Sequence, residues 1–340
     1  MGLAQLPNVC LVGCGGIAVR HAQAALEAAG SVRYGALFDA DPARVAALQQ
    51  RTGLAARVHH SWDDVLRDPE IDGVDLCLPN SLHARYALEA LAAGKHVLTE
   101  KPMALSVADC DRMIAAAERH GRLLTVIHNR RFDTPALALK ALVDSGDLGD
   151  PFLVETHGIE GPGTVGRGRW LANRDEGGIA MAQTVHFAYM VRWLLGEVTE
   201  VACFTSRKGI DWMAGEVSCV ILLRFAGDAI GEMTSTFAQE AGANEHRITI
   251  YGGRGIATHT RNTLRVICPA RYGDEEWHDI TFEGWDWGEG FRSQIAQFGE
   301  AIAGRGPVAV SPAEGRAAVE LIEAAYRSAD TRRAVRLPLE

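Results

Sequence analysis

The chain has 340 residues, of which 47% are hydrophobic and 23% charged, and its formal net charge is −9. This length has room for about two domains of ordinary size. The acidic balance argues against a nucleic-acid-binding protein, which usually presents a basic face, and no stretch approaches the roughly 20 apolar residues of a membrane span.

The beginning of the chain and its cysteines bear on the cellular compartment. The opening MGLAQLPNVCLVGCGG has no basic segment before its apolar run, so we expect no signal peptide. The seven cysteines are an odd number, scattered, with no C-x-x-C pair, which favours neither a disulfide framework nor a zinc site. We therefore expect a cytoplasmic protein with no metal, no membrane partner and no nucleic-acid partner.

The first part of the chain alternates apolar strand-like segments with amphipathic helix-like ones. The strand-like segments are 8–13, 32–39, 73–79, 95–100 and 122–127, and the helix-like ones are 17–30, 42–53, 82–94 and 106–121. This alternation predicts βαβ units and a parallel sheet with helices on both faces. Right-handed crossovers would bring the carboxyl ends of the strands to one edge, where ligands bind.

Near residue 126 the pattern changes. After a helix at about 135–146, extended segments follow with short turns at 151–159, 197–206, 217–225, 229–238, 246–252 and 263–268, with helices at 178–195, 288–304 and 311–329. Such β-rich spacing favours a largely antiparallel sheet. We predict a dinucleotide-binding domain over residues 1–125 and an α+β domain over residues 126–340.

A glycine motif joins the first strand to the first helix. Gly13 permits a tight turn, Gly15 lets a pyrophosphate approach the backbone, and the small Ala18 allows close packing of helix on strand. Asp39 ends the second predicted strand, where its carboxylate would accept hydrogen bonds from a ribose 2′-OH and repel a 2′-phosphate. The motif predicts NAD in preference to NADP; the alternative is a glycine-rich turn in another α/β protein.

A lysine lies at the ligand-binding edge of the predicted sheet. Lys101 follows the strand at 95–100, and Pro102 prevents that strand from continuing. A lysine that is partly desolvated beside a cofactor is suited to act as an acid or base. Without that context, a strand-end lysine is more often a solvated charge.

Taken together, several segments resemble one family. GCGGIA, DLCLPNSLHARYALEALAAGKHVLTEKP, HNRRF and the Gly-Gly…His stretch are similar to the Gfo/Idh/MocA oxidoreductases, over nearly the whole chain. The resemblance implies an N-terminal Rossmann domain and a C-terminal α/β domain with a large open sheet, used to form homodimers or homotetramers. It also implies NAD(P)-linked oxidation or reduction of sugars and cyclitols.

The same resemblance implies site residues. Those that would bind the cofactor are Gly13, Gly15, Gly16, Ile17, Asp39, Pro79, Asn80, His83, Glu100 and Lys101. Within this set, Glu100 would contact the nicotinamide ribose, and Lys101 would also bind the reacting hydroxyl. Asn129 and Arg131 would border the substrate. Arg130 or Arg131 would suit an anionic substrate, although an ordinary ion pair explains them equally well.

The stretch EGGIAMAQTVHFAYMVRWLLG departs from the family pattern. That pattern commonly has an aspartate four residues before the histidine, where this chain has Ala182 before His186. The sequence resembles a branch with a glutamine next, Gln183, several of whose members act on nucleotide or amino sugars. On a regular α-helix, Ala182 and His186 share a face and Gln183 points about 100° away, so Gln183 would not replace the aspartate.

His186 therefore has two readings. A lone histidine on an apolar helix is usually a buried core residue. With Lys101 and the cofactor motif in the same chain, we predict instead that His186 is a general base and that Lys101 and His186 are the catalytic residues. Gln183 would border the substrate.

Three tryptophans lie in glycine-rich loops, at Trp170, Trp285 and Trp287. Aromatic faces beside polar groups suit a polyol, and we place Trp170 among the substrate-binding residues. Equally, these side chains would pin loops to the core or form a subunit contact.

Three functions remain open on the sequence. The preferred one is hydride transfer between NAD(P) and a carbinol or ketone carbon of a sugar, cyclitol or sugar derivative held between the domains. A second is a non-catalytic regulator that binds NAD and a sugar, and a third is a redox-neutral lyase or glycosidase with bound NAD. Turnover and product analysis beside cofactor absorbance separate them.

Overall fold

The computed structural model describes residues 6–240 and 244–339. The chain divides into two compact units, one formed by residues 1–132 and 287–316 and the other by residues 133–286 and 317–340. The segment 287–316 thus belongs to the first unit. The boundary between residues 125 and 126 stays a prediction.

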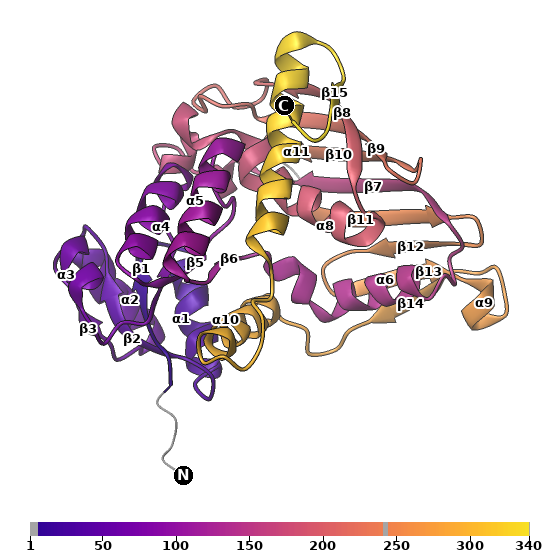
Figure 1. Ribbon diagram of the computed structural model, residues 1–340. Helices are drawn as coiled ribbons and strands as arrows, with labels where there is room; N and C mark the ends of the chain where they lie inside the picture. The colour runs from indigo at the N-terminus through magenta and orange to yellow at the C-terminus, as the bar shows by residue number, and fades with distance from the viewer. Residues whose placement is uncertain (1–5, 241–243, 340) are drawn as a thin grey trace. The chain divides into compact units, whose positions relative to one another are not determined.

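The first unit is built on a six-stranded parallel sheet (Figure 1). Its strands are β1 (Asn8–Val12), β2 (Arg33–Phe38), β3 (Arg57–Val58), β4 (Gly73–Leu76), β5 (His96–Thr99) and β6 (Leu124–Val126). Their order is β3-β2-β1-β4-β5-β6, so the direction of winding reverses between β1 and β4. This is the dinucleotide-binding arrangement, and it confirms the doubly wound parallel sheet.

Helices follow the strands as the alternation predicted. They are α1 (Ala18–Glu27), α2 (Pro42–Thr52), α3 (Trp62–Arg67), α4 (His83–Ala92) and α5 (Val107–His120). The short β3 and α3 were not predicted. Side-chain caps set the boundaries: Asp41 accepts a hydrogen bond from the Ala43 N–H at 3.0 Å, and Ser106 caps α5 in the same way. Left-handed glycines, Gly53 and Gly121, end these two helices.

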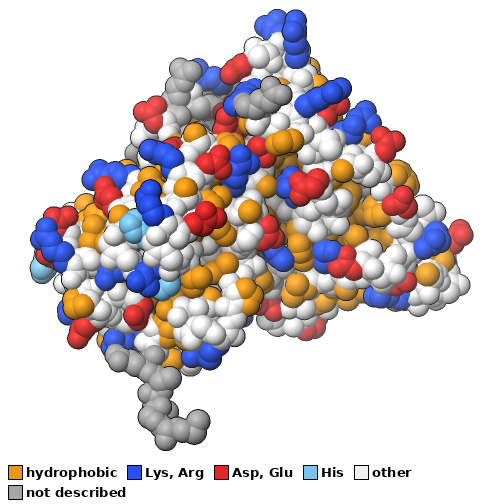
Figure 2. Space-filling model, in the orientation of Figure 1, with side chains coloured by type: hydrophobic (Ala, Val, Ile, Leu, Met, Phe, Trp, Pro, Cys, Tyr) orange, Lys and Arg blue, Asp and Glu red, His pale blue; other side chains and the backbone are white. Residues whose placement is uncertain are grey.

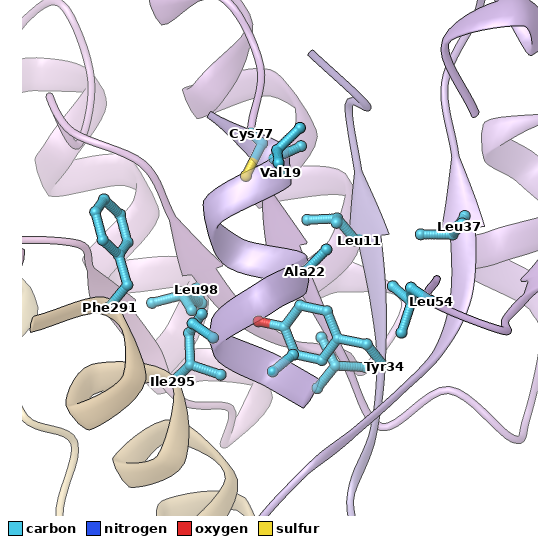
Figure 3. Packing of buried hydrophobic residues seen from close by; sticks show 14 of the residues in the cluster. Leu11, Val19, Ala22, Tyr34, Leu37, Leu54, Cys77, Leu98, Phe291 and Ile295 are labelled. Carbon is cyan, nitrogen blue, oxygen red and sulfur yellow. The ribbon is translucent and has the colours of Figure 1, made fainter. Parts of the chain in front are cut away.

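The core of this unit lies between its sheet and α1 (Figure 3). Val19 and Ala22 of α1 are buried with Leu11 and Leu37 of the strands. On the other side of α1, Phe291 and the rest of the apolar face of α10 (Glu289–Ile302) complete the same cluster. Burying aliphatic and aromatic side chains of this size contributes about 1.5–3 kcal/mol each, which explains why a segment so late in the chain joins the first unit.

The second unit contains a nine-stranded sheet. Its strands are β7 (Pro151–Ile159), β8 (Val198–Ser206), β9 (Ser218–Phe225), β10 (Ile230–Thr236), β11 (Glu245–Gly252), β12 (Gly255–His259), β13 (Thr263–Ile267), β14 (His278–Thr281) and β15 (Val335–Arg336). The order is β14-β13-β12-β11-β7-β10-β9-β8-β15, and only the β7–β10 pair is parallel. The mostly antiparallel sheet predicted for this part of the chain is confirmed.

The second unit also contains helices. They are α6 (Thr134–Asp144), α7 (Pro162–Val165), α8 (Val185–Leu195), α9 (Pro269–Tyr272) and α11 (Pro312–Thr331), whose first turn belongs to the first unit. In Figure 1, α6 lies along β12 and β13. The single α-helix predicted over 178–195 is wrong at its beginning, because Ala180–Thr184 forms a π-helical turn before α8.

The sheet presents two different faces. Along β9 the residues alternate, so that Ile221 and Leu223 are buried while Val220 and Leu222 are exposed. Phe204 of β8, which pairs with Val220 of β9, is 75% exposed. Strict alternation of this kind is typical of a sheet with one buried and one open face.

The surface carries charges of both signs, and the cysteines lie inside the protein. Figure 2 shows Lys and Arg side chains interspersed with Asp and Glu on the face drawn. None of the helices in the described ranges is long and apolar enough to cross a membrane. All seven cysteines are buried and none forms a disulfide.

Candidate functional site

The glycine motif lies at the switch point of the parallel sheet, between the ends of β1 and β4. Gly13 has φ +86° and donates its N–H to the Phe38 carbonyl at 2.8 Å. A Cβ at this position would overlap the carbonyl oxygen of Cys77. Both its conformation and this close approach require glycine, which fixes the path of the loop between β1 and α1.

The next part of the loop is open. A Cβ built on Gly15 would meet no atom within 4 Å, and Gly16 is exposed. The helix α1 then begins without a side-chain cap at Ile17. Its first backbone N–H groups are therefore not occupied by a capping side chain and suit an anionic phosphate. This glycine-lined space fits the pyrophosphate of a dinucleotide.

Asp39 follows β2 and faces the same loop. Its Oδ2 accepts a hydrogen bond from the Cys14 N–H at 2.7 Å, and its Oδ1 accepts one from the Asp41 N–H at 2.9 Å. Each carboxylate oxygen has a second lone pair for a further donor. The backbone thus holds the carboxylate beside the glycine loop, where the sequence motif predicted it.

Residues 79–83 follow β4. Pro79 precedes a short 3-10 turn, Asn80–Leu82, in which Asn80 is buried. The buried His83 ring lies close to two carbonyl oxygens, with Nδ1 2.7 Å from Pro102 and Nε2 2.9 Å from Leu78. Burial lowers the pKa of this imidazole. His83 therefore ties the loop after β4 to the loop after β5, and its contact with a cofactor stays a prediction.

Glu100 directly follows β5 and belongs to a buried network that the sequence did not reveal. Its Oε1 lies 3.0 Å from Nε2 of His21, and its Oε2 accepts the Lys101 N–H at 3.0 Å. The other ring nitrogen of His21 lies 2.7 Å from Asp75, which also accepts the Tyr34 hydroxyl at 2.6 Å. The available signal was Asp75, a charged residue between the apolar Val74 and Leu76 of a predicted strand, whereas His21 follows the charged Arg20 and offered no such signal.

The predicted substrate-bordering residues of the first unit form a short 3-10 turn, Asn129–Phe132. Asn129 is buried, and Arg131 donates to Glu314 at 2.8 Å. The other carboxylate oxygen of Glu314 holds Ser311, by its N–H at 2.8 Å and its hydroxyl at 2.9 Å. An ion pair within the unit is thus present at Arg131.

In the second unit, two glycines shape the entry to the histidine-bearing helix. Gly177 has φ +77°, and a Cβ on Gly178 would overlap the Glu216 carboxylate. That carboxylate accepts hydrogen bonds from the Ala180 N–H at 3.0 Å and from the Tyr326 hydroxyl at 2.8 Å. The Gly-Gly pair leaves room for the half-buried Glu216, which lies between β8 and β9, to cap the start of the helix.

The π-helical turn changes the expected direction of Gln183. Its Nε2 donates to Oε1 of Glu160 at 2.7 Å, and the same oxygen lies 2.6 Å from Nε2 of His246. We call Gln183, Glu160 and His246 the Glu160 cluster. The Val185 N–H bonds to the Ala180 carbonyl five residues back, so the side chains here do not follow the spacing of an α-helix. The predicted 100° offset of Gln183 holds for a regular α-helix and does not apply to this π-helical turn. Glu160 also places a carboxylate beside Gln183.

His186 lies in the first turn of α8 and is buried, as is Ala182 in the π-helical turn. Trp170 begins a 3-10 turn and is partly exposed. In the first unit, Trp287 packs edge-on against Phe291 at 5.5 Å between ring centroids. The contact with Phe291 supports the alternative that Trp287 fixes its loop to the core. The roles of His186 and Trp170 stay predictions.

Comparison with known proteins extends over both units. The family described as "Oxidoreductase family, NAD-binding Rossmann fold" matches residues 7–128, and its partner family, described as "C-terminal alpha/beta domain", matches residues 140–337. The chain is 27% identical over 337 residues to a myo-inositol 2-dehydrogenase of Thermotoga maritima, with 97% of this chain and 98% of that protein covered.

Two solved structures are similar along the whole chain. A levoglucosan dehydrogenase in complex with NADH and levoglucosan superposes with a TM-score of 0.89 at 24% identity, covering 98% of this chain and 100% of that one. The WlbA dehydrogenase of Bordetella pertussis, in complex with NADH and UDP-GlcNAcA, superposes with a TM-score of 0.85 at 25% identity, covering 99% of each. With the glycine loop, the sheet order and both family matches in agreement, the chain belongs to the Gfo/Idh/MocA family of NAD-binding oxidoreductases.

Proposed function

We propose that this protein is an NAD-dependent dehydrogenase that oxidises a secondary alcohol of a sugar, a cyclitol or a sugar derivative, and catalyses the reverse reduction. The observation that carries the proposal is the first unit, in which an open glycine loop, the carboxylate of Asp39 and the Glu100–Lys101 pair all follow strands at one edge of a parallel sheet. Ligands bind at this edge in such folds.

The proposed cofactor is NAD rather than NADP. Gly13, Gly15, Gly16 and Ile17 would hold its pyrophosphate, and Asp39 would accept the 2′-OH of the adenosine ribose. A 2′-phosphate at that position would face a carboxylate already fixed by two backbone N–H groups, and like charges repel. Bound NAD supplies the hydride acceptor at its nicotinamide ring.

The proposed catalytic residues are Lys101 and His186. The ammonium group of Lys101 would bind the reacting hydroxyl and stabilise the alkoxide that develops on it. His186 would accept the hydroxyl proton, and would return it when the reaction runs toward the alcohol. Asn129, Arg131, Trp170 and Gln183 would bind the remaining groups of the substrate.

The substrate class is inferred from two sources. Relatives of this chain carry the names myo-inositol 2-dehydrogenase and levoglucosan dehydrogenase. Both myo-inositol and levoglucosan have a ring that bears several hydroxyl groups. The Glu160 cluster in this chain offers a carboxylate, an amide and an imidazole within hydrogen-bond distance of one another. Groups of this kind recognise hydroxyls.

We also propose that the protein is a homodimer or homotetramer joined through the open face of its nine-stranded sheet. Phe204 and Leu222 are 75% and 48% exposed on that face. Large apolar side chains gathered on one surface are typical of a subunit interface. Light scattering of the wild-type protein and of a Phe204→Glu, Leu222→Glu variant would measure the assembly.

The decisive experiment replaces Lys101. We expect Lys101→Met to reduce turnover by about 10²- to 10⁴-fold on a polyol panel, because the group that binds the reacting hydroxyl is lost, with dissociation constants for NAD changed less than tenfold. Lys208→Met is the matched control, since Lys208 is an exposed lysine of the second unit.

Initial rates, followed by NADH absorbance, and NAD and NADP titrations measure these outcomes. Unchanged turnover in Lys101→Met contradicts the assigned role. Wild-type protein that binds NAD tightly but turns over no substrate would be a regulator, and a rearranged product without net NADH would indicate a redox-neutral enzyme.

A further inference from the structure

A continuous chain of hydrogen bonds crosses the interior of the first unit. The Tyr34 hydroxyl donates to Oδ2 of Asp75 at 2.6 Å, and the same oxygen lies 2.7 Å from Nδ1 of His21. The other ring nitrogen of His21 lies 3.0 Å from Oε1 of Glu100. Glu100 also accepts the backbone N–H of Lys101 at 3.0 Å. The chain thus runs from the middle of the sheet to the residue before the proposed catalytic lysine.

The network is closed to solvent except at Glu100. The side chains of His21 and Asp75 are 0% exposed, and that of Glu100 is 7% exposed. Burying unpaired charges at this depth would cost several kcal/mol each. The pairing of the three groups is therefore what permits them to lie beside a hydrophobic core.

The hydrogen-bond geometry fits a doubly protonated ring. Both nitrogens of His21 face a carboxylate oxygen, and an ionised carboxylate only accepts hydrogen bonds. Both nitrogens must then donate, which only the imidazolium form does. Burial alone would lower the pKa of His21, but the charge of Asp75 and its hydrogen bond raise it well above its ordinary range.

The same interaction acts on Glu100. Burial opposes its ionisation, yet the hydrogen bond and charge of His21, together with the charge of Lys101, hold the pKa of the carboxyl below its usual value. Two further titratable groups face the ring or Asp75. Burial raises the pKa of the Cys77 thiol to about 12, and the pKa of Tyr34 lies well above its ordinary range for the same reason, so both stay neutral.

A metal ion is the competing explanation for such a cluster. In the described ranges, ligand atoms of His21, Asp75 and Cys77 lie within 4.8 Å of one another. A metal would need the lone pair of a ring nitrogen, but Nδ1 lies at hydrogen-bond distance from Asp75 and Nε2 from Glu100. A proton between ring and carboxylate fits these distances better.

We propose that His21 is a positioning residue of the cofactor site, a permanent imidazolium that keeps Glu100 ionised and correctly oriented to accept the nicotinamide-ribose hydroxyl. The proposal rests on the proposed function for the contact between Glu100 and NAD. Each oxygen of Glu100 uses one lone pair within the protein and keeps another for a ligand donor. A protonated Glu100 would offer one acceptor fewer and turn a donor toward the ribose.

The first test does not depend on the cofactor. The ¹⁵N and ¹³Cε1 signals of the His21 ring, assigned by their loss in His21→Gln, are followed by NMR in the wild-type protein from about pH 5.5 to pH 8.5. We expect the shifts of a doubly protonated ring throughout. A ring that titrates near the ordinary histidine value of about 6.5 overturns the proposal, as does a stoichiometric metal found by elemental analysis.

The second test measures NAD affinity against pH. In the wild-type protein we expect little change between about pH 6 and pH 8. In His21→Gln, Glu100 loses its cation, so its pKa rises and NAD should bind about 10- to 100-fold more weakly at pH 6, with recovery as pH rises. Glu100→Gln should show a similar loss without the recovery, and the double variant should be no weaker than Glu100→Gln.

His120→Gln is the matched control, because His120 is an exposed histidine of the same unit. Additive losses in the double variant, or unchanged affinity in His21→Gln at every pH, contradict the positioning role. If His21→Gln fails to fold, Asp75→Asn removes the charge that raises the pKa of His21 and should weaken NAD binding by a factor of about 3 to 10; no change there contradicts the positioning role. A wild-type protein that binds NAD without turnover would refute the proposed function. The NMR signals of His21 and the pH dependence of NAD affinity would still test the positioning role.

Discussion

Each of the two units places a histidine against a carboxylate, and the two arrangements differ in burial and in the number of partners. In the first unit, His21 is fully enclosed and bridges two acids with both ring nitrogens. In the Glu160 cluster of the second unit, one oxygen of Glu160 meets both the amide of Gln183 and the ring of His246, whose side chain is 23% exposed. The site around His21 holds a fixed charge inside the protein. In the Glu160 cluster, the ring of His246 is open to solvent or to a ligand.

This difference reflects what surrounds each carboxylate. Asp75 sits in the middle of a parallel strand with neighbours on both sides, so its charge has to be matched inside the protein. Glu160 directly follows β7, where the chain leaves the sheet. Strand ends commonly carry functional side chains, while strand centres carry structural ones.

The largest expected effect is on the site around His21. We expect Asp75→Asn to lower the free energy of unfolding by about 3–5 kcal/mol, because it leaves the buried imidazolium with one partner fewer. Urea denaturation measures the loss. Asp111→Asn, which removes the half-exposed partner of Arg316, should cost no more than about 1 kcal/mol. Equal losses would mean that the buried network contributes no more than a surface ion pair.

The second effect is a pH dependence of stability. The folded-state pKa of His21 is raised, so its contribution is fully present below about pH 6.5 and falls by about 1.4 kcal/mol per pH unit above it, until the folded-state value is passed. The folded-state pKa of Glu100 is lowered, so its contribution is present above about pH 4.5 and is lost below. The stability gap between wild type and His21→Gln should be widest between these limits and shrink toward pH 9. A gap that widens with rising pH has the wrong sign for a buried imidazolium.

The smallest stability effect is expected at the Glu160 cluster. Glu160→Gln keeps the shape of the side chain and removes its charge, so we expect a loss of about 1–2 kcal/mol. Because this carboxylate is proposed to recognise substrate hydroxyls, KM for the polyol should rise about tenfold while NAD affinity stays unchanged. Initial-rate kinetics and NAD titration separate the two. An unchanged KM would make the cluster structural, like the network around His21.

Sequence reasoning predicted the parts of the fold that have a periodic signal. The alternation before residue 126 and the β-rich spacing after it gave both sheets, but the two residues of β3 are too short for any period to register. The sequence predicted the helix α10 but not its contact with α1. An amphipathic pattern shows that one face of a helix is buried, but it does not show which element covers that face.

The same limit applies to the sites. Gly13 and Asp39 are joined by a known spacing, so the sequence predicted both. The partners of His21 lie 54 and 79 residues away, and Glu160 and His246 are 86 residues apart. No local pattern connects such pairs. The π-helical turn was missed for another reason, since Ala180–Thr184 has the composition of an ordinary α-helix and the widened turn depends on its tertiary surroundings.

The return of residues 287–316 to the first unit has a consequence for how the protein is made. Phe291, Ile295 and Phe298 fill the outer side of α1, yet they are synthesised after nearly the entire second unit. The apolar outer side of α1 therefore stays uncovered during synthesis while about 150 further residues emerge, at roughly 5–20 residues per second. A fragment cut after residue 132 would keep this exposed side permanently, so an independently expressed cofactor unit needs the late segment joined back to it.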